Sequence, residues 1–266
     1  MTNTRPPAVA GAFYPGNPGI LAATVDQLLA DAPTTPETQP KALIVPHAGY
    51  VYSGATAGQA YAQLAPWREQ IHRVVLLGPT HRVAVDGIAV PQTDAFATPL
   101  GNIPLDTAAL ASLADLPQIV ASDRAHAQEH SLEVHLPLLQ RLLGQFTLVP
   151  LAVGHAAPKE VAEVLDRLWG GPETLIVVSS DMSHFLPYAA AKHVDSETCA
   201  HILQLDTHIR PEQACGAYPI NGLLLAARQR GLTPRLIDHC NSGDTAGDKQ
   251  RVVGYAAFSF TEAQDA

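Results

Sequence analysis

The sequence is poor in cysteine, and this excludes one class of fold. Its 266 residues include only Cys199, Cys215 and Cys240, an odd number of cysteines placed far apart. Small secreted domains that depend on disulfides carry many cysteines in close, even sets. We therefore expect each cysteine to be a free thiol or a metal ligand.

Basic residues and long apolar runs are also scarce. There are 16 lysines and arginines against 25 acidic residues, and the formal net charge is −9. Binding to a phosphate backbone needs clustered basic side chains, so nucleic acid is not expected as a partner. The opening MTNTRPPAVAGAFYPG lacks the pattern of a signal peptide, and no run approaches eighteen apolar residues. These absences predict a cytoplasmic protein that does not insert into a membrane.

Apolar residues, in contrast, make up 47% of the chain, and charged residues only 15%. Continuous apolar runs are typical of buried parallel strands, and here they alternate with helical patterns. We predict strands at 42–45, 73–77, 87–90, 146–153, 174–178, 234–237 and 252–260, and helices at 20–30, 55–64, 105–113, 132–143, 159–168, 197–205 and 221–230. The prediction is one α/β domain over 1–266 with a central, mainly parallel or mixed sheet and helices on both faces. A polar connector is expected at 33–40 and a frayed tail at 261–266.

Polar residues follow three of these strands directly. His47 comes after ALIV, His81 after VVLLG, and Asp181 and His184 after LIVVSS. Ligands of open α/β sheets bind beyond the carboxyl ends of the strands, where parallel strands bring such residues together. A single histidine is usually a surface or core residue, but several at equivalent strand ends favour a shared site. Neutral imidazole is the commonest metal ligand, so a metal is the natural reason for the cluster.

The segment EHSLEVHLP forms a second group of polar residues. His130 and Glu133 are three residues apart and would share a helix face. Glu129 and His130 either belong to the site or only cap the helix start, and the pattern leaves both open. We expect His135 to be structural.

The remaining candidates lie near the C-terminus. Cys215 precedes Gly216 at a predicted helix start, where the helix dipole favours a thiolate. Cys199 lies inside a helical pattern, where a buried, inert thiol is expected. The loop HCNSGDTAGD, which contains Asn241 and Asp244, is either a turn or the rim of a pocket.

Six blocks in order, VPHAGYVYSG, LGPTH, EHSLEVHLP, SSDMSH, CGAYPI and NSGDTAGDKQRVVGYAA, resemble the Memo-like family, including its AmmeMemoRadiSam system protein B type. The resemblance runs from AGAFYP to the last strand. It implies a fold similar to that of class III extradiol dioxygenases, with a pocket at the strand ends.

The resemblance also implies roles for individual residues. His47, His81 and Cys215 would hold the metal, while His184 and Asp181 would act in catalysis. The dioxygenases hold iron(II), so iron(II) is the metal expected first. Cysteine stands where they have glutamate, and because a thiolate is softer and more easily oxidised than a carboxylate, copper or zinc are alternatives. Cys240 departs from the expected small or apolar residue, and if it faces the pocket it could form a disulfide with Cys215. Other residues expected around the pocket are Glu129, His130, Tyr50, Asn241 and Asp244.

Three functions are compatible with these residues. The first is an iron-dependent, dioxygenase-like oxidoreductase acting on an unknown small or peptide-borne substrate. The second is a non-catalytic protein that binds iron, copper or a peptide. The third is a hydrolase with Cys215 as nucleophile and His184 as base. The resemblance further implies a shared pathway with AMMECR-type and radical S-adenosylmethionine proteins.

Overall fold

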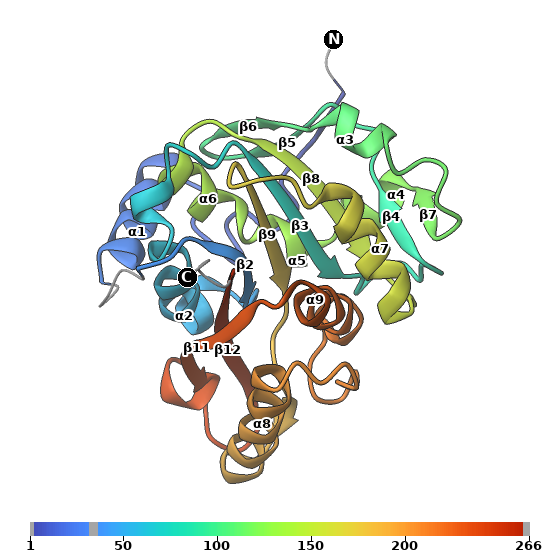
Figure 1. Cartoon of the computed structure of the whole chain (residues 1–266). Coiled ribbons are helices and arrows are strands. Elements are labelled where there is room, and N and C mark those ends of the chain that lie inside the picture. Colours follow the sequence, from blue (N-terminus) through green and yellow to red (C-terminus); the bar gives the residue numbers. More distant parts are fainter. Residues whose placement is uncertain (1–2, 32–36, 263–266) are drawn as a thin grey trace.

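A large mixed sheet with helices on both faces forms the centre of the computed structural model (Figure 1). The structure describes residues 3–31 and 37–262, so half of the connector expected at 33–40 and most of the tail expected at 261–266 lie outside the described residues. The strands of this sheet are β2 (Pro40–Val45), β3 (Arg73–Pro79), β4 (Ile88–Val90), β7 (Ile119–Ala121), β8 (Thr147–Val153), β9 (Thr174–Ser179), β10 (His184–Leu186), β11 (Thr233–Asn241) and β12 (Val252–Thr261).

The strand order is β10-β12-β2-β9-β3-β8-β4-β7, with β11 also paired to β12. The four central strands β2, β9, β3 and β8 run parallel to one another. β12 and β4 add antiparallel pairs on either side of them. The predicted mainly parallel or mixed α/β sheet is therefore confirmed.

Helices cover both faces of this sheet. They are α1 (Pro18–Ala30), α2 (Tyr50–Ala62), α3 (Thr107–Ala111), α4 (Asp123–Ala127), α5 (His130–Glu133), α6 (Leu136–Leu143), α7 (Pro158–Leu168), α8 (Tyr188–Leu203) and α9 (Ala217–Arg230), with 3-10 turns at Ala65–Trp67 and Ser242–Asp244. A second sheet lies beside them, in the order β1 (Thr4–Arg5), β5 (Ala95–Thr98) and β6 (Gly101–Pro104).

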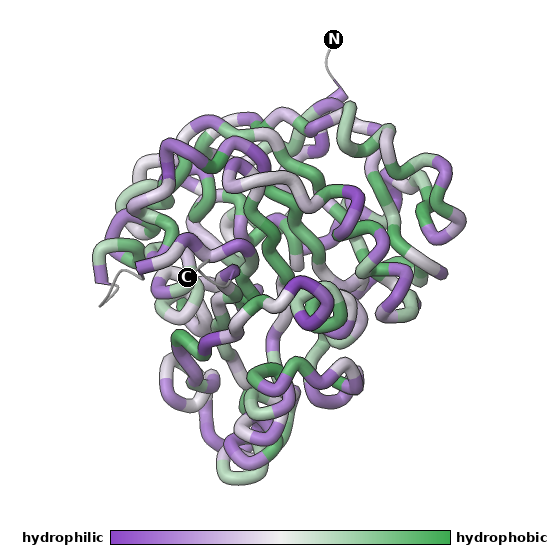
Figure 2. The backbone as a smooth tube through the Cα atoms, viewed as in Figure 1, coloured by the Kyte–Doolittle hydropathy of each residue, from purple (hydrophilic) through white to green (hydrophobic). Residues whose placement is uncertain are grey.

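The core consists of two apolar clusters, one on each face of the large sheet. Along β2, Ala42 and Ile44 belong to the cluster with α7, α8 and α9, whereas Leu43 and Val45 belong to the cluster with α1, α2 and α6. This alternation follows from the two-residue period of a strand, and because both faces are covered the whole strand is apolar. Figure 2 shows the hydrophobic strands inside and hydrophilic segments outside.

All seven predicted strands are present, but several helix boundaries differ from the prediction. The helix expected at 132–143 is divided into α5 and α6, with Pro137 in the first turn of α6, where proline is favoured but cannot continue a preceding helix. α8 begins at Tyr188, whereas the prediction began at 197. The prediction missed the first part of this helix because its run of small residues has no clear hydrophobic periodicity. The prediction missed β1, β5, β6, β7 and β10, which have two to four residues each. Within the described residues no helix has the length and apolar character needed to cross a membrane.

Candidate metal centre

The candidate site lies at the carboxyl edge of three neighbouring parallel strands. His47 follows β2 by two residues, His81 follows β3 by two, and Asp181 follows β9, which lies between them. Parallel strands end on the same side of a sheet, so this order places the three side chains close together. The strand order thus brings together the residues that the sequence located only at separate strand ends.

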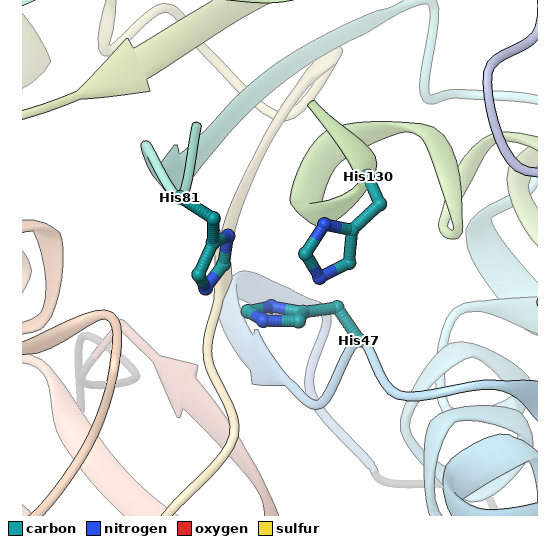
Figure 3. Close-up of side chains that lie close together, drawn as sticks. All are labelled: His47, His81 and His130. Carbon is teal, nitrogen blue, oxygen red and sulfur yellow. The ribbon is translucent and has the colours of Figure 1, made fainter. Parts of the chain in front are cut away.

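Three imidazole rings meet at this edge. One ring nitrogen each from His47, His81 and His130 lies within 4.8 Å of the others. The ring centroids are 4.5 Å apart for His81 and His130, and 5.3 and 5.4 Å from each of these to His47. Figure 3 shows the three rings facing a common point. The geometry therefore groups His130, expected only around the pocket, with two of the three expected metal ligands.

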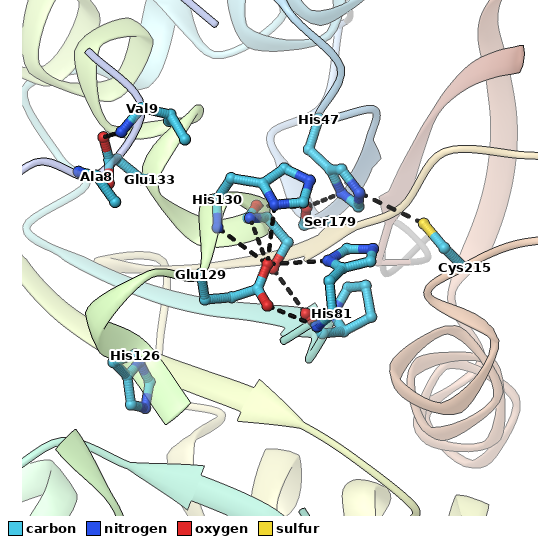
Figure 4. Close-up of polar contacts among 12 residues, drawn as sticks. Ala8, Val9, His47, His81, His126, Glu129, His130, Glu133, Ser179 and Cys215 are labelled. Atoms are coloured by element: carbon cyan, nitrogen blue, oxygen red, sulfur yellow. Dashed lines mark hydrogen bonds and ion pairs between the residues drawn. The ribbon is translucent and has the colours of Figure 1, made fainter. Parts of the chain in front are cut away.

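Glu129 orients His81. Its Oε1 lies 2.9 Å from His81 Nδ1, and its Oε2 accepts a 2.6 Å hydrogen bond from the His81 backbone N–H (Figure 4). Burial raises the pKa of this carboxyl, but hydrogen bonds and the charge of His81 outweigh it and lower the pKa to about 2. The carboxylate occupies Nδ1 and leaves Nε2 of His81 available as a ligand, an arrangement common for metal-binding histidines.

Glu129 also caps α5. The same Oε1 accepts hydrogen bonds from the backbone N–H groups of His130 and Ser131, at 2.9 and 3.0 Å. The two interpretations left open by the sequence, helix cap and site residue, therefore describe one side chain. The cap fixes the backbone of His130 while the carboxylate orients His81.

His47 is oriented by a residue that the sequence reasoning missed. Ser179, at the end of β9, lies with its Oγ 2.6 Å from His47 Nδ1. The signal available in the sequence was the polar pair SS at the end of an apolar strand. Burial lowers the pKa of His47 well below its usual value, with the neighbouring histidine charges acting in the same direction, so the ring is neutral at pH 7. Neutral imidazole is the form that binds metal.

Cys215 borders the three histidines but is held differently. Its Sγ lies 3.4 Å from His47 Nε2 and accepts a 3.3 Å hydrogen bond from the Asp181 backbone N–H. Gly216 permits this approach, since a Cβ there would lie 2.7 Å from the Ser179 carbonyl oxygen. The helix start was expected to favour the thiolate; burial, together with the charge of Asp181, instead raises the pKa of Cys215 to about 12.

Asp181 and His184 lie next to this group. Asp181 accepts a 2.7 Å hydrogen bond from the His47 backbone N–H. Burial raises the pKa of Asp181 to about 7, against the lowering effect of that hydrogen bond. His184 begins β10, and burial lowers the pKa of its ring.

Two cavities include His184 in their lining. One, of about 440 Å³, is lined by His130, Asp181 and His184 together with Phe13, Tyr52, Arg251 and Tyr255. The other, of about 570 Å³, is lined by His81, His184 and Cys215 together with Arg210. His130 and His81 of the candidate centre therefore line different cavities.

Three other expected pocket residues have structural contacts. The Tyr50 hydroxyl donates to the Val134 carbonyl at 2.9 Å, and the cavity side of this helix is occupied by Tyr52 instead. Asn241 caps the following 3-10 turn through Gly243. Asp244 accepts hydrogen bonds from Tyr188 and from the Asn241 backbone.

The structure shows the state of each of the three cysteines. All three cysteines are free, and Cys199 is buried as expected. Cys240 Sγ lies 3.3 Å from Thr56 Oγ1 of α2. The disulfide considered between Cys215 and Cys240 is thus not formed.

Glu133 points away from the three histidines and binds the N-terminal segment. It forms a buried ion pair with Arg5 and accepts hydrogen bonds from Tyr14 and from the backbone of Ala8 and Val9. Arg5 in turn donates to the Glu129 carbonyl at 2.8 Å. The N-terminal segment therefore braces the loop that carries Glu129 and His130.

Comparison with known proteins identifies the family. The model of the Memo-like protein family matches residues 5–259. MEMO1 family proteins of Aquifex aeolicus and Archaeoglobus fulgidus are 36% and 35% identical, each over 96% of this chain and 98% or 99% of theirs. One from Sulfolobus acidocaldarius is 33% identical over 96% of this chain and 99% of its own. The crystal structure of an uncharacterized Escherichia coli K12 protein shares the fold, with a TM-score of 0.53, 14% identity and coverage of 83% of this chain and 99% of that one. This chain belongs to the Memo-like family.

Proposed function

We propose that this protein is a metal-dependent oxidoreductase, similar to dioxygenases in using iron(II), that acts on a small or peptide-borne substrate. The observation that carries the proposal is the group of three imidazoles with ligand atoms within 4.8 Å of one another. Two of these rings have Nδ1 engaged by Ser179 and Glu129, which leaves Nε2 for a metal. Three protein ligands are the usual number in a centre that keeps open positions.

The donor set fits a first-row transition metal. Imidazole suits iron, copper and zinc alike, so the histidines alone leave copper or zinc as alternatives to iron(II). The Cys215 thiol, 3.4 Å from His47 Nε2, is a further donor. A bound cation would reverse the effect of burial on its pKa, because coordinating thiols lose their proton. Bound iron would supply one-electron chemistry and a binding position for dioxygen.

The chain's own residues would bind substrate and move protons. The 440 Å³ cavity is lined by His130, by the cation of Arg251 and by three aromatic side chains, those of Phe13, Tyr52 and Tyr255. His184 lines both cavities, so it can reach a substrate in either one and act as acid or base. Asp181 holds the backbone of His47 and lies beside His184 in the same cavity, which suits a role in orientation.

A non-catalytic metal-binding or peptide-binding protein is the second candidate. The feature that favours it is Cys215, a soft and oxidisable donor beside the histidines. Nucleophilic use of Cys215 is less favoured, because a reactive cysteine needs a lowered pKa and burial raises this one to about 12.

Metal analysis of protein purified anaerobically tests the proposal. We expect stoichiometric iron in the wild type and loss of iron in His81→Ala and His130→Ala. His208→Ala removes a surface histidine that is 87% exposed and serves as the matched control, so it should keep the metal.

The same experiment separates the candidates. Iron that is retained, and that consumes dioxygen when candidate substrates are supplied, supports the oxidoreductase. Copper held only through Cys215, lost in Cys215→Ser but kept in both histidine variants, would favour the binding protein. Protein without metal under every condition would refute the oxidoreductase and the metal-binding protein, and would leave only peptide binding.

A further inference from the structure

A chain of buried hydrogen bonds runs from His47 into the core. His47 Nδ1 lies 2.6 Å from Ser179 Oγ, Ser179 Oγ lies 2.9 Å from His135 Nε2, and His135 Nδ1 lies 2.9 Å from the Tyr61 hydroxyl. All four side chains are 0–1% exposed. The contacts join the segment between β2 and α2 to the end of β9, to His135 just before α6, and to α2.

A third contact of Ser179 Oγ, with the Ser131 carbonyl, fixes the direction of every hydrogen bond in the chain. Ser179 Oγ also lies 2.6 Å from the Ser131 carbonyl oxygen, which can only accept. A serine hydroxyl has one hydrogen and two lone pairs. The hydrogen therefore goes to Ser131, and both histidines must donate to Ser179.

The tautomers of His47 and His135 follow, because both rings must donate a hydrogen bond to Ser179 Oγ. His47 must carry its hydrogen on Nδ1, so the lone pair of Nε2 faces the centre. His135 must carry its hydrogen on Nε2, so its Nδ1 accepts from Tyr61. Each polar atom in the chain is then satisfied, as buried groups require.

We infer that Ser179, His135 and Tyr61 form a positioning relay that holds His47 in the Nδ1-protonated tautomer and presents Nε2 to a metal. His135 is then more than the structural residue expected from the sequence. The tautomer stands on the contacts alone, and its use in metal binding rests on the function proposed above.

The relay ends inside the protein and carries no charge. Tyr61 is fully buried in the apolar cluster that includes α1, α2 and α6, and burial lowers the pKa of His135 to about 3, so the His135 ring is neutral at pH 7. His81 differs, because it is held by the charged carboxylate of Glu129. A carboxylate that accepts a hydrogen bond from an imidazole makes that imidazole a stronger metal ligand. We therefore expect His81 to bind a metal more strongly than His47.

Nitrogen NMR of histidine-labelled, metal-free protein tests the relay directly. Long-range proton–nitrogen spectra distinguish the two tautomers of each ring. We expect a protonated Nδ1 for His47 and a protonated Nε2 for His135. In Ser179→Ala, His47 should lose its single tautomer, and in Ser179→Thr, which keeps the hydroxyl, it should retain it.

A metal titration of the same variants completes the test. Loss of such an orienting partner typically weakens metal binding by about 10–100-fold, which we expect for Ser179→Ala and not for Ser179→Thr. Thr198→Val removes a buried hydroxyl of α8 outside the relay and should change neither measurement.

The outcomes separate the relay from the proposed function. A wild-type His47 protonated on Nε2, or a tautomer unchanged in Ser179→Ala, would overturn the relay. The expected tautomers without binding of iron(II) or cobalt(II) would leave the relay standing and refute the metal function. If Ser179→Ala does not fold, the wild-type spectrum and Ser179→Thr still decide the question.

Discussion

Replacement of Glu129 by glutamine tests how the site is held together. Glutamine keeps the shape of the side chain but removes the charge and turns one acceptor oxygen into a donor. Oε1 accepts from His81 Nδ1 and from two backbone N–H groups, whereas Oε2 accepts only from the His81 backbone. The least costly amide orientation therefore keeps its oxygen at Oε1 and turns its NH₂ group toward the His81 backbone N–H.

The expected loss of stability follows from this one pair of facing hydrogen-bond donors. Leaving one buried donor unsatisfied costs about 1–3 kcal/mol, so the free energy of unfolding should fall by this amount. The loss of the carboxylate behind His81 should also weaken metal binding by about 10–100-fold. The two effects are measured separately, by chemical denaturation of the metal-free protein and by competitive metal titration.

Glu160→Gln provides the matched control. Glu160 also accepts a backbone hydrogen bond near a helix start, from Ala157, but it is exposed and lies away from the three histidines. We expect little change in stability and none in metal affinity. A Glu129→Gln variant with wild-type metal affinity and stability would show that the carboxylate does not hold His81 as the geometry indicates.

Three further perturbations should give defined results. Arg5→Met leaves the buried carboxylate of Glu133 without its partner, so denaturation should show a loss of about 3–5 kcal/mol, and a loss below about 1 kcal/mol would contradict the bracing role. Burial lowers the pKa of His126 from 6.5 to about 4, so the stability that its neutral ring provides is complete above pH 6.5 and is lost as the pH falls toward 4, at about 1.4 kcal/mol per pH unit. His126→Gln should flatten the stability profile in that window, and an unchanged slope would refute the assignment. Gly216→Ala should lower the melting temperature, because its Cβ would lie 2.6 Å from the Ser180 Cβ, whereas Gly19→Ala, with only a 3.4 Å contact to the side chain of Asn17, should not.

The amino-acid sequence by itself determined the class of fold and the edge at which the site lies. Apolar runs mark buried strands because a strand covered on both faces has no polar side, and this local signal located each described strand of six or more residues, together with the shorter β4. The residues that follow a parallel strand must lie at its carboxyl edge. His47, His81, Asp181 and His184 could therefore be assigned to one region before any strand order was known.

Only the tertiary structure decided which atoms meet. The sequence carried no information that β9 lies between β2 and β3, and this order is what brings Ser179 to His47 across 132 residues of chain. Ring orientation, and with it the grouping of His130 with the other two histidines, depends on hydrogen bonds to partners such as Glu129 rather than on spacing along the chain. Cys240 similarly turned out to contact Thr56 of α2. Strand periodicity is a local property, whereas side-chain direction and protonation are set by long-range contacts, so only the fold could fix them.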